Sequence, residues 1–378
     1  MPQQPRVWVR AAAGCVVLGL LVSCARAMEE QGSRPEGGLG ASAARPGLVD
    51  RAAHTATTAT AAAVVVAGGC VVDGCSAATA STFIVDSHGY RETDAMGTAR
   101  DAHVGVRLRD GTVLVVGGFV GENQPPLVSG ETYDLTTGHW SATGDMALGR
   151  GGHAAAILGT GRVLVAGGWA RPRTYTDTTE IFDPVSRQFT AGPSLPAPTD
   201  GLTATSLKDG TVLVVGGQVS PGVATGQAAV VSQDGHRAEL VGNLATPRFK
   251  HAAVRLPSGQ VLIVGGTKDD DTLLRTTEIY DPETRAFRAG PTMSDGRYKL
   301  AGGAVALPDG RVVVAGSAAG LEVIDISRFT SRLALAESGT PSSFATASVI
   351  GGNLRVIGGY DRSIRLSRTD LTVDIADL

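Results

Sequence analysis

The sequence has no excess of charge of either sign, and it has no long hydrophobic run beyond its first two dozen residues. Its 378 residues include 33 basic and 36 acidic side chains. This balance gives none of the positive surface that nucleic-acid binding requires. No later stretch approaches 18 consecutive apolar residues, so we expect no membrane-spanning helix in the rest of the chain.

Common catalytic motifs are also missing. The chain contains no Gly-x-Ser-x-Gly turn, no phosphate-binding loop and no His-Glu-x-x-His pattern. Its glycines precede loops and not helices, which argues against a nucleotide. We therefore predict neither a cofactor nor a metal. Glycine itself is abundant, with 51 residues, and 43% of the residues are hydrophobic. This composition is typical of a folded chain with many turns.

The first 23 residues are predicted to be an export signal. Arg6 and Arg10 precede an apolar run, Ala11–Val22, which is too short to span a bilayer but suits a secretory signal. The run ends in the sequence LVSC, which resembles a bacterial lipobox and makes Cys24 a candidate for lipidation. Ordinary signal cleavage after Ala27 is the alternative, and it would release a soluble protein.

Residues 24–47 are predicted to be a flexible tether. They are rich in glycine, alanine, proline and charge and show no apolar period. The expected organisation is a signal at residues 1–23, the tether at 24–47 and a folded body at 48–378. We place the exported protein in the bacterial periplasm or cell envelope, held at the membrane only by its N-terminal lipid.

Only two cysteines remain in the folded body. Cys15 is lost with the signal and Cys24 is the lipidation candidate, which leaves Cys70 and Cys75. An exported chain meets an oxidising compartment, so two cysteines five residues apart are predicted to form a disulfide. A metal site would need further histidine or cysteine ligands nearby, and that segment has none.

The folded body is an internal repeat. A Gly-Gly pair ends a β-branched run at six places, and Gly316-Ser317 occupies a seventh, at intervals of 49, 50, 49, 49, 51 and 42 residues. The six pairs begin at Gly68, Gly117, Gly167, Gly216, Gly265 and Gly358. Seven repeat units follow from this spacing.

Other positions keep step with the glycine pairs. Seventeen residues before each pair stand Arg51, Arg100, Arg150, Thr199, Arg248, Lys299 and Pro341. Fourteen residues before each pair stand His54, His103, His153, Leu202, His251, Gly302 and Phe344. A glycine lies six residues before six of the pairs, and three of these glycines follow aspartate, at Asp110, Asp209 and Asp309. Asp-Gly predicts a tight hairpin turn, because both residues tolerate positive φ.

Each unit is predicted to contain four short antiparallel strands. The runs that flank the hairpin turn are five to seven residues long and rich in β-branched residues. Downstream, three units carry an alternating strand with an aromatic residue, Tyr133, Phe182 or Tyr280, and a second aromatic residue seven positions later. Four-stranded units repeated about every 49 residues predict a β-propeller.

The units closely resemble kelch repeats. The resemblance rests on Gly-Gly after a hydrophobic strand, Glu-x-Tyr/Phe-Asp, a later Trp or Phe, and the Met-x3-Arg-x2-His junction. It covers about residues 50–378 and is similar to the bacterial kind related to the central domain of galactose oxidase. It implies an all-β, seven-bladed kelch-type propeller of four-stranded antiparallel blades. A six-bladed ring with a degenerate flank is the alternative.

Ring closure has two possible solutions. We expect the C-terminus to complete its own blade with strands near Ile364–Arg368 and Leu371–Ala376. The alternative is that residues around Leu39–Pro46 supply the outer strand.

The repeated Arg-x-x-His pairs could in principle hold a metal, but repetition in successive units favours a structural role. We assign that role to Arg100, His103, Arg150, His153, Arg248 and His251. The copper chemistry of galactose oxidase does not carry over, because this chain has no Tyr-His pair and no spare cysteine. The kelch-type sialic acid mutarotase is a second enzymatic relative, and no residue set transfers from it. No catalytic residue is predicted.

Two loop segments are the candidate ligand sites. Antiparallel strand order places the loops between second and third strands at one end of the ring, and these loops vary most. One carries Trp169, Arg171, Arg173 and Tyr175, which suit stacking on sugars or anchoring a protein. Another carries Asp269, Asp270 and Asp271, which could bind a cation with ligands from elsewhere.

The sequence therefore predicts a binding module for a protein or polysaccharide at the cell envelope. The alternative is a carbohydrate-acting enzyme that uses the axial pocket. An enzyme should show clustered ionisable side chains with perturbed pKa values on the loop face. A binding module should show an apolar and basic patch near Trp169.

Overall fold

Each unit begins with a hairpin that its turn residues determine. In the second unit, Asp110 Oδ1 accepts a hydrogen bond from the Thr112 amide at 3.0 Å, and Gly111 has a φ of 92°. The turn brings Val104–Arg107 against Val113–Val116 in antiparallel register. A positive φ costs glycine little, which is why the turn recurs with glycine at this place.

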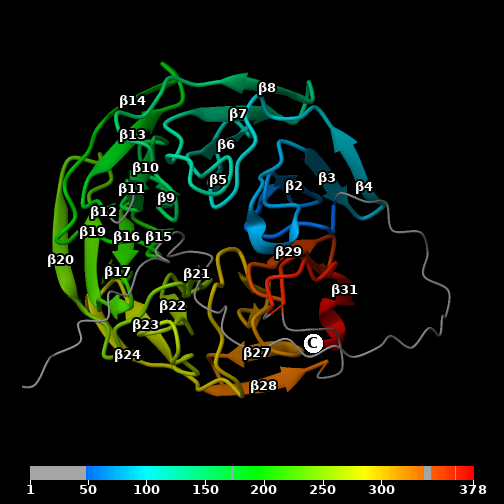
Figure 1. The fold of residues 1–378 in the computed structure, drawn as a ribbon. Helices are drawn as coiled ribbons and strands as arrows, with labels where there is room; N and C mark the ends of the chain where they lie inside the picture. Colours follow the sequence, from blue (N-terminus) through cyan, green and yellow to red (C-terminus); the bar gives the residue numbers. More distant parts are fainter. Residues whose placement is uncertain (1–47, 172–173, 336–341, 362) are drawn as a thin grey trace, which may run out of the picture.

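The computed structural model describes residues 48–171, 174–335, 342–361 and 363–378. These residues form seven antiparallel sheets, the blades, around a central axis (Figure 1). The seven-bladed, all-β propeller predicted from the sequence is confirmed, and the six-bladed alternative is wrong. The only helical segments in the described residues are two short 3-10 turns, η1 (Asp73–Cys75) and η2 (Ile375–Asp377).

The first three blades follow the strand order of the chain from the axis outward. Blade 1 contains β1 (Thr55–Thr60), β2 (Ala63–Ala67), β3 (Thr82–Asp86) and β4 (Gly89–Thr93). Blade 2 contains β5 (Val104–Arg107), β6 (Val113–Val116), β7 (Gly130–Asp134) and β8 (His139–Ala142). Blade 3 contains β9 (Ala154–Ile157), β10 (Val163–Ala166), β13 (Thr179–Asp183) and β14 (Gln188–Ala191).

The remaining blades repeat this arrangement. Blade 4 contains β15 (Thr203–Ser206), β16 (Val212–Val215), β19 (Gln227–Val231) and β20 (Ala238–Asn243). Blade 5 contains β21 (Ala252–Arg255), β22 (Val261–Val264), β23 (Thr277–Asp281) and β24 (Ala286–Ala289). Blade 6 contains β25 (Ala304–Ala306), β26 (Val312–Val314), β27 (Leu321–Asp325) and β28 (Thr330–Ala334). Blade 7 contains β29 (Thr346–Ile350), β30 (Asn353–Ile357) and β31 (Asp370–Asp374).

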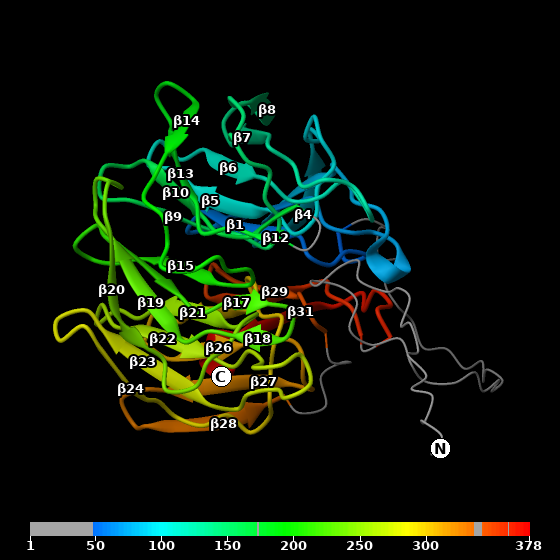
Figure 2. The ribbon, with the colours of Figure 1, turned by 60° about the vertical axis from the view of Figure 1, so that its left-hand side comes forward.

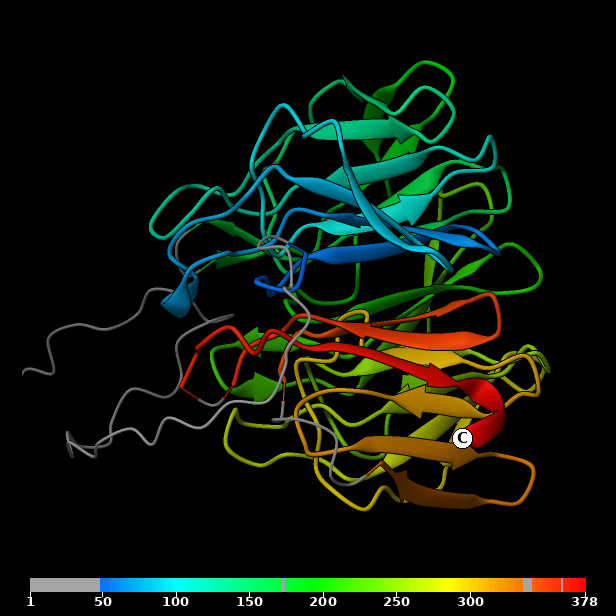
Figure 3. The same cartoon turned by 90° about the vertical axis from the view of Figure 1, so that its right-hand side faces the viewer.

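Two small hairpins extend the loops of blades 3 and 4. They are β11 (Trp169–Arg171) with β12 (Thr174–Tyr175), and β17 (Gln218–Ser220) with β18 (Val223–Ala224). Figure 2 shows both on the same side of the ring, and Figure 3 shows η1 projecting from that side while η2 lies on the other. We call the side with β11–β12, β17–β18 and η1 the loop face.

Seven equivalent backbone hydrogen bonds join the blades. The second residue of each glycine pair donates its N–H to a carbonyl in the next blade, as in Gly118 to Arg150 at 2.7 Å. The last bond runs from Gly359 to Arg51 at 2.7 Å and closes the ring. Both pair glycines have positive φ. A Cβ on the first would press against the next blade, and a Cβ on the second would press against the junction residues of its own blade. The recurrence of Gly-Gly follows from this close approach.

The core lies between the blades. The second strand of blade 2, β6, is fully buried, as the non-alternating runs predicted. The predicted aromatic residues pair across neighbouring strands, with ring centroids of Tyr280 and Phe287 5.0 Å apart. Each such pair packs toward the preceding blade, and Tyr280 lies in one cluster with Leu213 of blade 4.

Blade 7 is shorter than expected. Its third strand is β31, and the expected strand near Ile364–Arg368 is instead a single bridge between Tyr360 and Leu366. Within the described residues the blade therefore has three strands. The alternative outer strand, Leu39–Pro46, lies outside the described residues. In the part of the chain that the structure describes, no helix is long and apolar enough to cross a bilayer.

Candidate functional site

The repeated arginines organise the loop end of their own blades. Arg100 is fully buried and donates to the carbonyl oxygens of Gly117 and Ser129 at 2.9 and 3.0 Å. It also pairs with Glu131 at 2.9 Å, and Glu131 in turn accepts from the Gly97 amide. Arg150 pairs with Glu180 and Arg248 with Glu278 in the same way. The terminal guanidinium nitrogens of these arginines are thus used by the framework, whereas Nε of Arg100 and of Arg150 is buried without a hydrogen-bond partner among the described residues.

Three of the four repeated histidines join their blade to the one before it by a side-chain hydrogen bond, and His153 makes no such bond to any described residue. His251 Nε2 lies 2.9 Å from Thr203 Oγ1, and His54 Nε2 lies 2.8 Å from Thr346 Oγ1. His103 lies 3.2 Å from Thr55 in the same manner. Burial, together with the nearby Arg248, lowers the pKa of His251 to about 3, so the ring is neutral at physiological pH.

The sixth and seventh units depart from the predicted register. The sequence spacing put Lys299 at the arginine position of unit 6. In the structure Arg297 donates to the Gly316 carbonyl at 2.8 Å, and Leu300 takes the histidine place. Arg297 stands 19 residues before its glycine, where the equivalent arginines stand 17 residues before theirs. In unit 7, Ser342 replaces Pro341 at this position.

A second ring of backbone hydrogen bonds surrounds the loop-face end of the axis. It is formed by the residue two positions after each junction arginine, and all seven have φ between 48° and 67°. Its members are Ala53, Ala102, Gly152, Gly201, Lys250, Lys299 and Phe344. Five of the seven donate an N–H to the ring residue of the preceding blade, as in Lys250 to the Gly201 carbonyl at 2.9 Å. At Lys299 the donor to the preceding blade is the next residue, Leu300. We call this set the axial ring.

The axial ring is asymmetric. On blades 2, 3 and 4 it consists of Ala102, Gly152 and Gly201, which are small and half-buried. On blades 5 and 6 it carries Lys250 and Lys299, which are 7% and 8% exposed. The axial end therefore has two different parts. On blades 2, 3 and 4 small residues leave the backbone accessible, and on blades 5 and 6 two lysine amines contact neighbouring side chains.

Lys250 belongs to a charged cluster drawn from blades 3, 4 and 5. Its Nζ lies 2.6 Å from Asp270 Oδ1. Asp200, which is fully buried, accepts from Gln218 Nε2 at 2.9 Å, while its other oxygen, Oδ1, has no hydrogen-bond partner among the described residues. Burial raises the pKa of Asp200 to about 6, although the Gln218 hydrogen bond and Lys250 oppose the shift.

Tyr175 faces the same cluster from the β11–β12 hairpin. Burial raises the pKa of its hydroxyl, and the charges of Asp200 and Asp270 raise it further. Tyr175 pairs in register with Trp169, whose ring meets Phe119 edge-on at 6.2 Å between centroids. We call Tyr175, Asp200, Lys250 and Asp270 the axial cluster.

The second ring lysine has aromatic surroundings. Lys299 Nζ donates to the Tyr360 hydroxyl at 2.9 Å and lies within 6 Å of the ring centroids of Tyr298, Phe344 and Tyr360. Burial holds the pKa of Tyr360 well above its usual value, so this hydroxyl is neutral. Cation–π contact stabilises the ammonium in this position.

Asp101 is a separate buried carboxyl beside the ring. It is 1% exposed, and its Oδ1 has no hydrogen-bond partner among the described residues. Burial raises its pKa to about 7. It can therefore exchange a proton near neutral pH.

The structure places the predicted ligand residues in different surroundings. Tyr175 and Asp270, predicted on separate loops, come together at Asp200. Trp169 is half-buried beside them. Asp269 caps its own loop by accepting from the Thr272 amide at 2.6 Å, and Asp271 is exposed. Arg171 is described only as part of β11, and Arg173, like Cys24, lies outside the described residues.

Sequence reasoning missed Asp200, Gln218 and the two ring lysines. The available signal was the variable pair between the positions of arginine and histidine in each unit, which is Asp200-Gly201 in unit 4 and Phe249-Lys250 in unit 5. The Glu-x-Tyr/Phe-Asp motif contains Glu131, Glu180 and Glu278, but their ion pairs with the junction arginines were not predicted.

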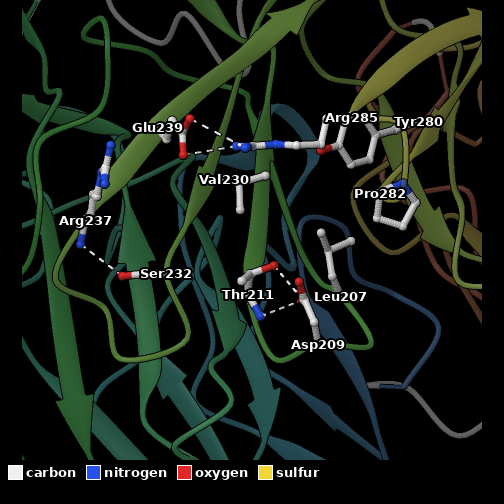
Figure 4. Close-up of a pocket in the computed structure, with 10 residues that line it drawn as sticks. All are labelled: Leu207, Asp209, Thr211, Val230, Ser232, Arg237, Glu239, Tyr280, Pro282 and Arg285. Carbon is white, nitrogen blue, oxygen red and sulfur yellow. Dashed lines mark hydrogen bonds and ion pairs between the residues drawn. The ribbon is translucent and has the colours of Figure 1, made fainter.

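One cavity of about 390 Å³ lies away from the loop face, between the outer parts of blades 4 and 5 (Figure 4). An ion pair between Glu239 and Arg285 crosses it, with an N–O distance of 3.2 Å. Both side chains are about half exposed and neutralise each other. The cavity lacks the buried, unsatisfied polar atoms of the axial end, so it is the weaker candidate.

The predicted cysteine pair is a disulfide in the structure, with Cα atoms 5.0 Å apart. Within residues 48–171, 174–335, 342–361 and 363–378, no group of three His, Cys, Asp or Glu side chains is arranged to hold a metal ion.

Comparison with known proteins finds kelch motifs in this chain. The family profile described as Kelch motif matches residues 102–147, 149–196 and 248–294, which contain the strands of blades 2, 3 and 5. The solved structure of YjhT is similar, with a TM-score of 0.60 and 13% identity over 76% of this chain and 98% of YjhT. A likeness at this identity shows the fold. No curated protein sequence matches the chain.

Proposed function

This chain is a kelch-repeat β-propeller, and on that premise we propose that it is a binding module for a saccharide at the axial end of its loop face. The observation that carries the proposal is the axial cluster, in which polar groups of three blades converge beside Trp169. Sugars are bound by an aromatic face together with fixed polar groups, and both are present here.

The contacts divide into two layers. Tyr175 and Trp169 are half-buried, and the Asp270 side chain is 18% exposed, so these residues meet the ligand. Asp200 and Lys250 lie beneath them and fix their charge and position. The small residues of the axial ring on blades 2, 3 and 4 leave backbone accessible alongside. A small polyol can use such a surface better than a flat protein partner can.

A glycan array probed with the full chain tests the proposal. We expect discrete saccharide binding that is lost in Trp169→Ala and weakened about tenfold in Tyr175→Phe, since each removes a direct contact. Tyr280→Phe makes the same chemical change at the outer cavity and should leave binding intact. Equal loss in Tyr175→Phe and Tyr280→Phe, or no binding to any glycan, would refute the proposal.

A carbohydrate-acting enzyme is the second candidate. The pKa values of Asp200, about 6, and Asp101, about 7, favour it, because such groups can transfer protons near neutral pH. Incubation of an array-selected saccharide with the chain, followed by proton NMR, separates the two candidates. Turnover by the wild type that Asp200→Asn abolishes indicates an enzyme, whereas an unchanged sugar indicates a binding module.

We further propose that the protein is exported and lipid-anchored through Cys24, which places its partner at the cell envelope. The support is the basic start, the short apolar run and the LVSC sequence. Mass spectrometry of the protein from bacterial membranes should find acyl chains on Cys24. A soluble protein that begins at Met28 would contradict the anchor.

A further inference from the structure

The b–c loop of blade 1, residues 70–78, contacts the blades on both of its sides. Gly74 N–H donates to the Ile364 carbonyl of blade 7 at 2.9 Å, and Leu366 N–H donates to Asp73 Oδ1 at 3.0 Å. On the other side, Ala78 N–H donates to the Val120 carbonyl of blade 2 at 3.3 Å. This loop therefore joins blade 7 to blade 2 across the closure of the ring.

The disulfide gives this loop its shape. It joins Cys70, which bridges to Ala52 at the blade junction, to Cys75 at the end of η1. Between them, η1 presents both groups that hold blade 7, the Gly74 amide and the Asp73 carboxylate. Cys75 itself has a φ of 58° and would not hold this position without support.

The same loop is part of a buried cluster that reaches the axial ring. Cys70 and Cys75 are 0% and 2% exposed and pack with Tyr360 and Phe344, against which Ile364 and Leu366 also pack. Tyr360 and Phe344 are two of the rings around Lys299. The loop therefore lies where the first and last blades meet, and where the described part of blade 7 has three strands instead of four.

We propose that the Cys70–Cys75 disulfide is a reducible clasp that closes the propeller at the loop face. With the disulfide intact, η1 holds residues 364–366 of blade 7 against blade 1. Reduction frees η1, and the blade 7 loop then opens locally while blades 3 to 5 are unaffected. The rings of Tyr360 and Phe344 lose part of their packing, so the environment of Lys299 changes with the redox state.

The reduction itself is a simple exchange. A dithiol reductant gives two electrons and two protons to the Cys70–Cys75 bond, which becomes two thiols, and the reductant becomes a disulfide. Both sulfurs are buried, so attack on the bond requires a prior local opening of the loop.

Hydrogen–deuterium exchange of the full chain, with and without dithiothreitol, tests the clasp. Reduction should accelerate exchange in residues 361–369 about tenfold and leave β9 to β24 unchanged. The Cys70→Ser/Cys75→Ser variant should match the reduced wild type and should no longer respond to dithiothreitol. Asp73→Ala keeps the disulfide and removes one acceptor, so it should loosen residue 366 without making the chain sensitive to reductant.

Two results would overturn the proposal. Unchanged exchange at 361–369 after complete reduction, verified by thiol alkylation, would show that the disulfide does not hold blade 7. A uniform rise across all seven blades would show that it acts on global stability and not as a local clasp. The comparison of oxidised and reduced wild type suffices if the double variant does not fold.

Discussion

Single residues at the loop face show how burial sets charge in this propeller. Two aspartates are shifted toward the neutral acid, Asp101 to a pKa of about 7 and Asp200 to about 6. The junction histidines are shifted the opposite way, toward the neutral base, with His251 at about 3. Burial is the main cause in each case, because it disfavours whichever form carries charge. The two groups therefore give opposite contributions to stability as the pH changes.

Asp101 should make the fold less stable as the pH rises. Its ordinary pKa is 3.8 and its folded value is about 7, so between these values the folded state holds a proton that the unfolded state has lost. We predict that Asp101→Asn has the stability of the wild type at pH 4 and exceeds it by roughly 3 kcal/mol at pH 8. Urea unfolding at both pH values measures this. A difference independent of pH would contradict it.

His251 should make the fold less stable as the pH falls. The unfolded imidazole takes a proton near pH 6.5, but the folded one resists protonation down to about pH 3. Leucine occupies the same place in blades 4 and 6, at Leu202 and Leu300. We predict that His251→Leu loses about 1 kcal/mol at pH 8, where the Thr203 hydrogen bond is missing, yet is more stable than wild type at pH 4. The same order at both pH values would disprove the assignment.

At the scale of the strand and turn, stability depends on where the backbone approaches a neighbouring blade. Gly111 and Gly118 both have φ near 90°, but they differ in surroundings. A Cβ at Gly111 would meet nothing within 4 Å, whereas one at Gly118 would lie 2.9 Å from the His103 Cβ and press on the Asp101 carbonyl. The first glycine is needed only for its turn, and the second also for its close packing against Asp101 and His103 at the start of blade 2.

The pair gives a matched test. Gly111→Ala should lower the free energy of unfolding by about 1 kcal/mol, the cost of positive φ alone. Gly118→Ala carries the same backbone cost and adds a steric clash, so we expect a loss of at least about 3 kcal/mol. Chemical denaturation of both variants measures the difference. Equal losses would mean that the glycine pair is not a packing requirement.

The hairpin turns are tested in blade 6. Asp309 Oδ1 accepts from the Arg311 amide at 3.0 Å, and Gly310 has a φ of 91°. The combined change of Asp309→Ala and Gly310→Ala removes the turn hydrogen bond and strains the backbone. We expect a loss of about 1–2 kcal/mol. An unchanged melting temperature would count against this turn.

These elements also show what the sequence could predict. Gly-Gly, Asp-Gly and the aromatic pairs recur because the local geometry of each blade requires them. The strands and the seven blades could therefore be predicted from the sequence. The prediction that Lys299 occupies the arginine position of unit 6 was wrong, because two additional residues in this unit place Arg297 there. The axial cluster was missed because Tyr175, Asp200 and the Lys250–Asp270 pair belong to three successive units and meet only when the blades pack side by side. The residue spacing within one unit does not indicate which side chains of neighbouring units come into contact.

At the scale of the whole molecule, closure brings together residues that lie far apart in the chain. The Gly359 to Arg51 bond completes the ring, and each turn of the ring places a junction residue at the axis. Four blades contribute small residues there and two contribute lysines, so one continuous scaffold produces a one-sided binding surface. Residues that recur from unit to unit form the framework of the propeller, and residues that differ between units form the candidate site.

The most direct test is hydrogen–deuterium exchange of the full chain with and without a saccharide that it binds on the array. The account predicts slower exchange in residues 169–176, 218–224 and 267–273, the loops around Tyr175, Gln218 and Asp270, and no change around the outer cavity at Arg237 and Arg285. Protection confined to the outer cavity, or to the outer strands β20 and β24, would contradict it.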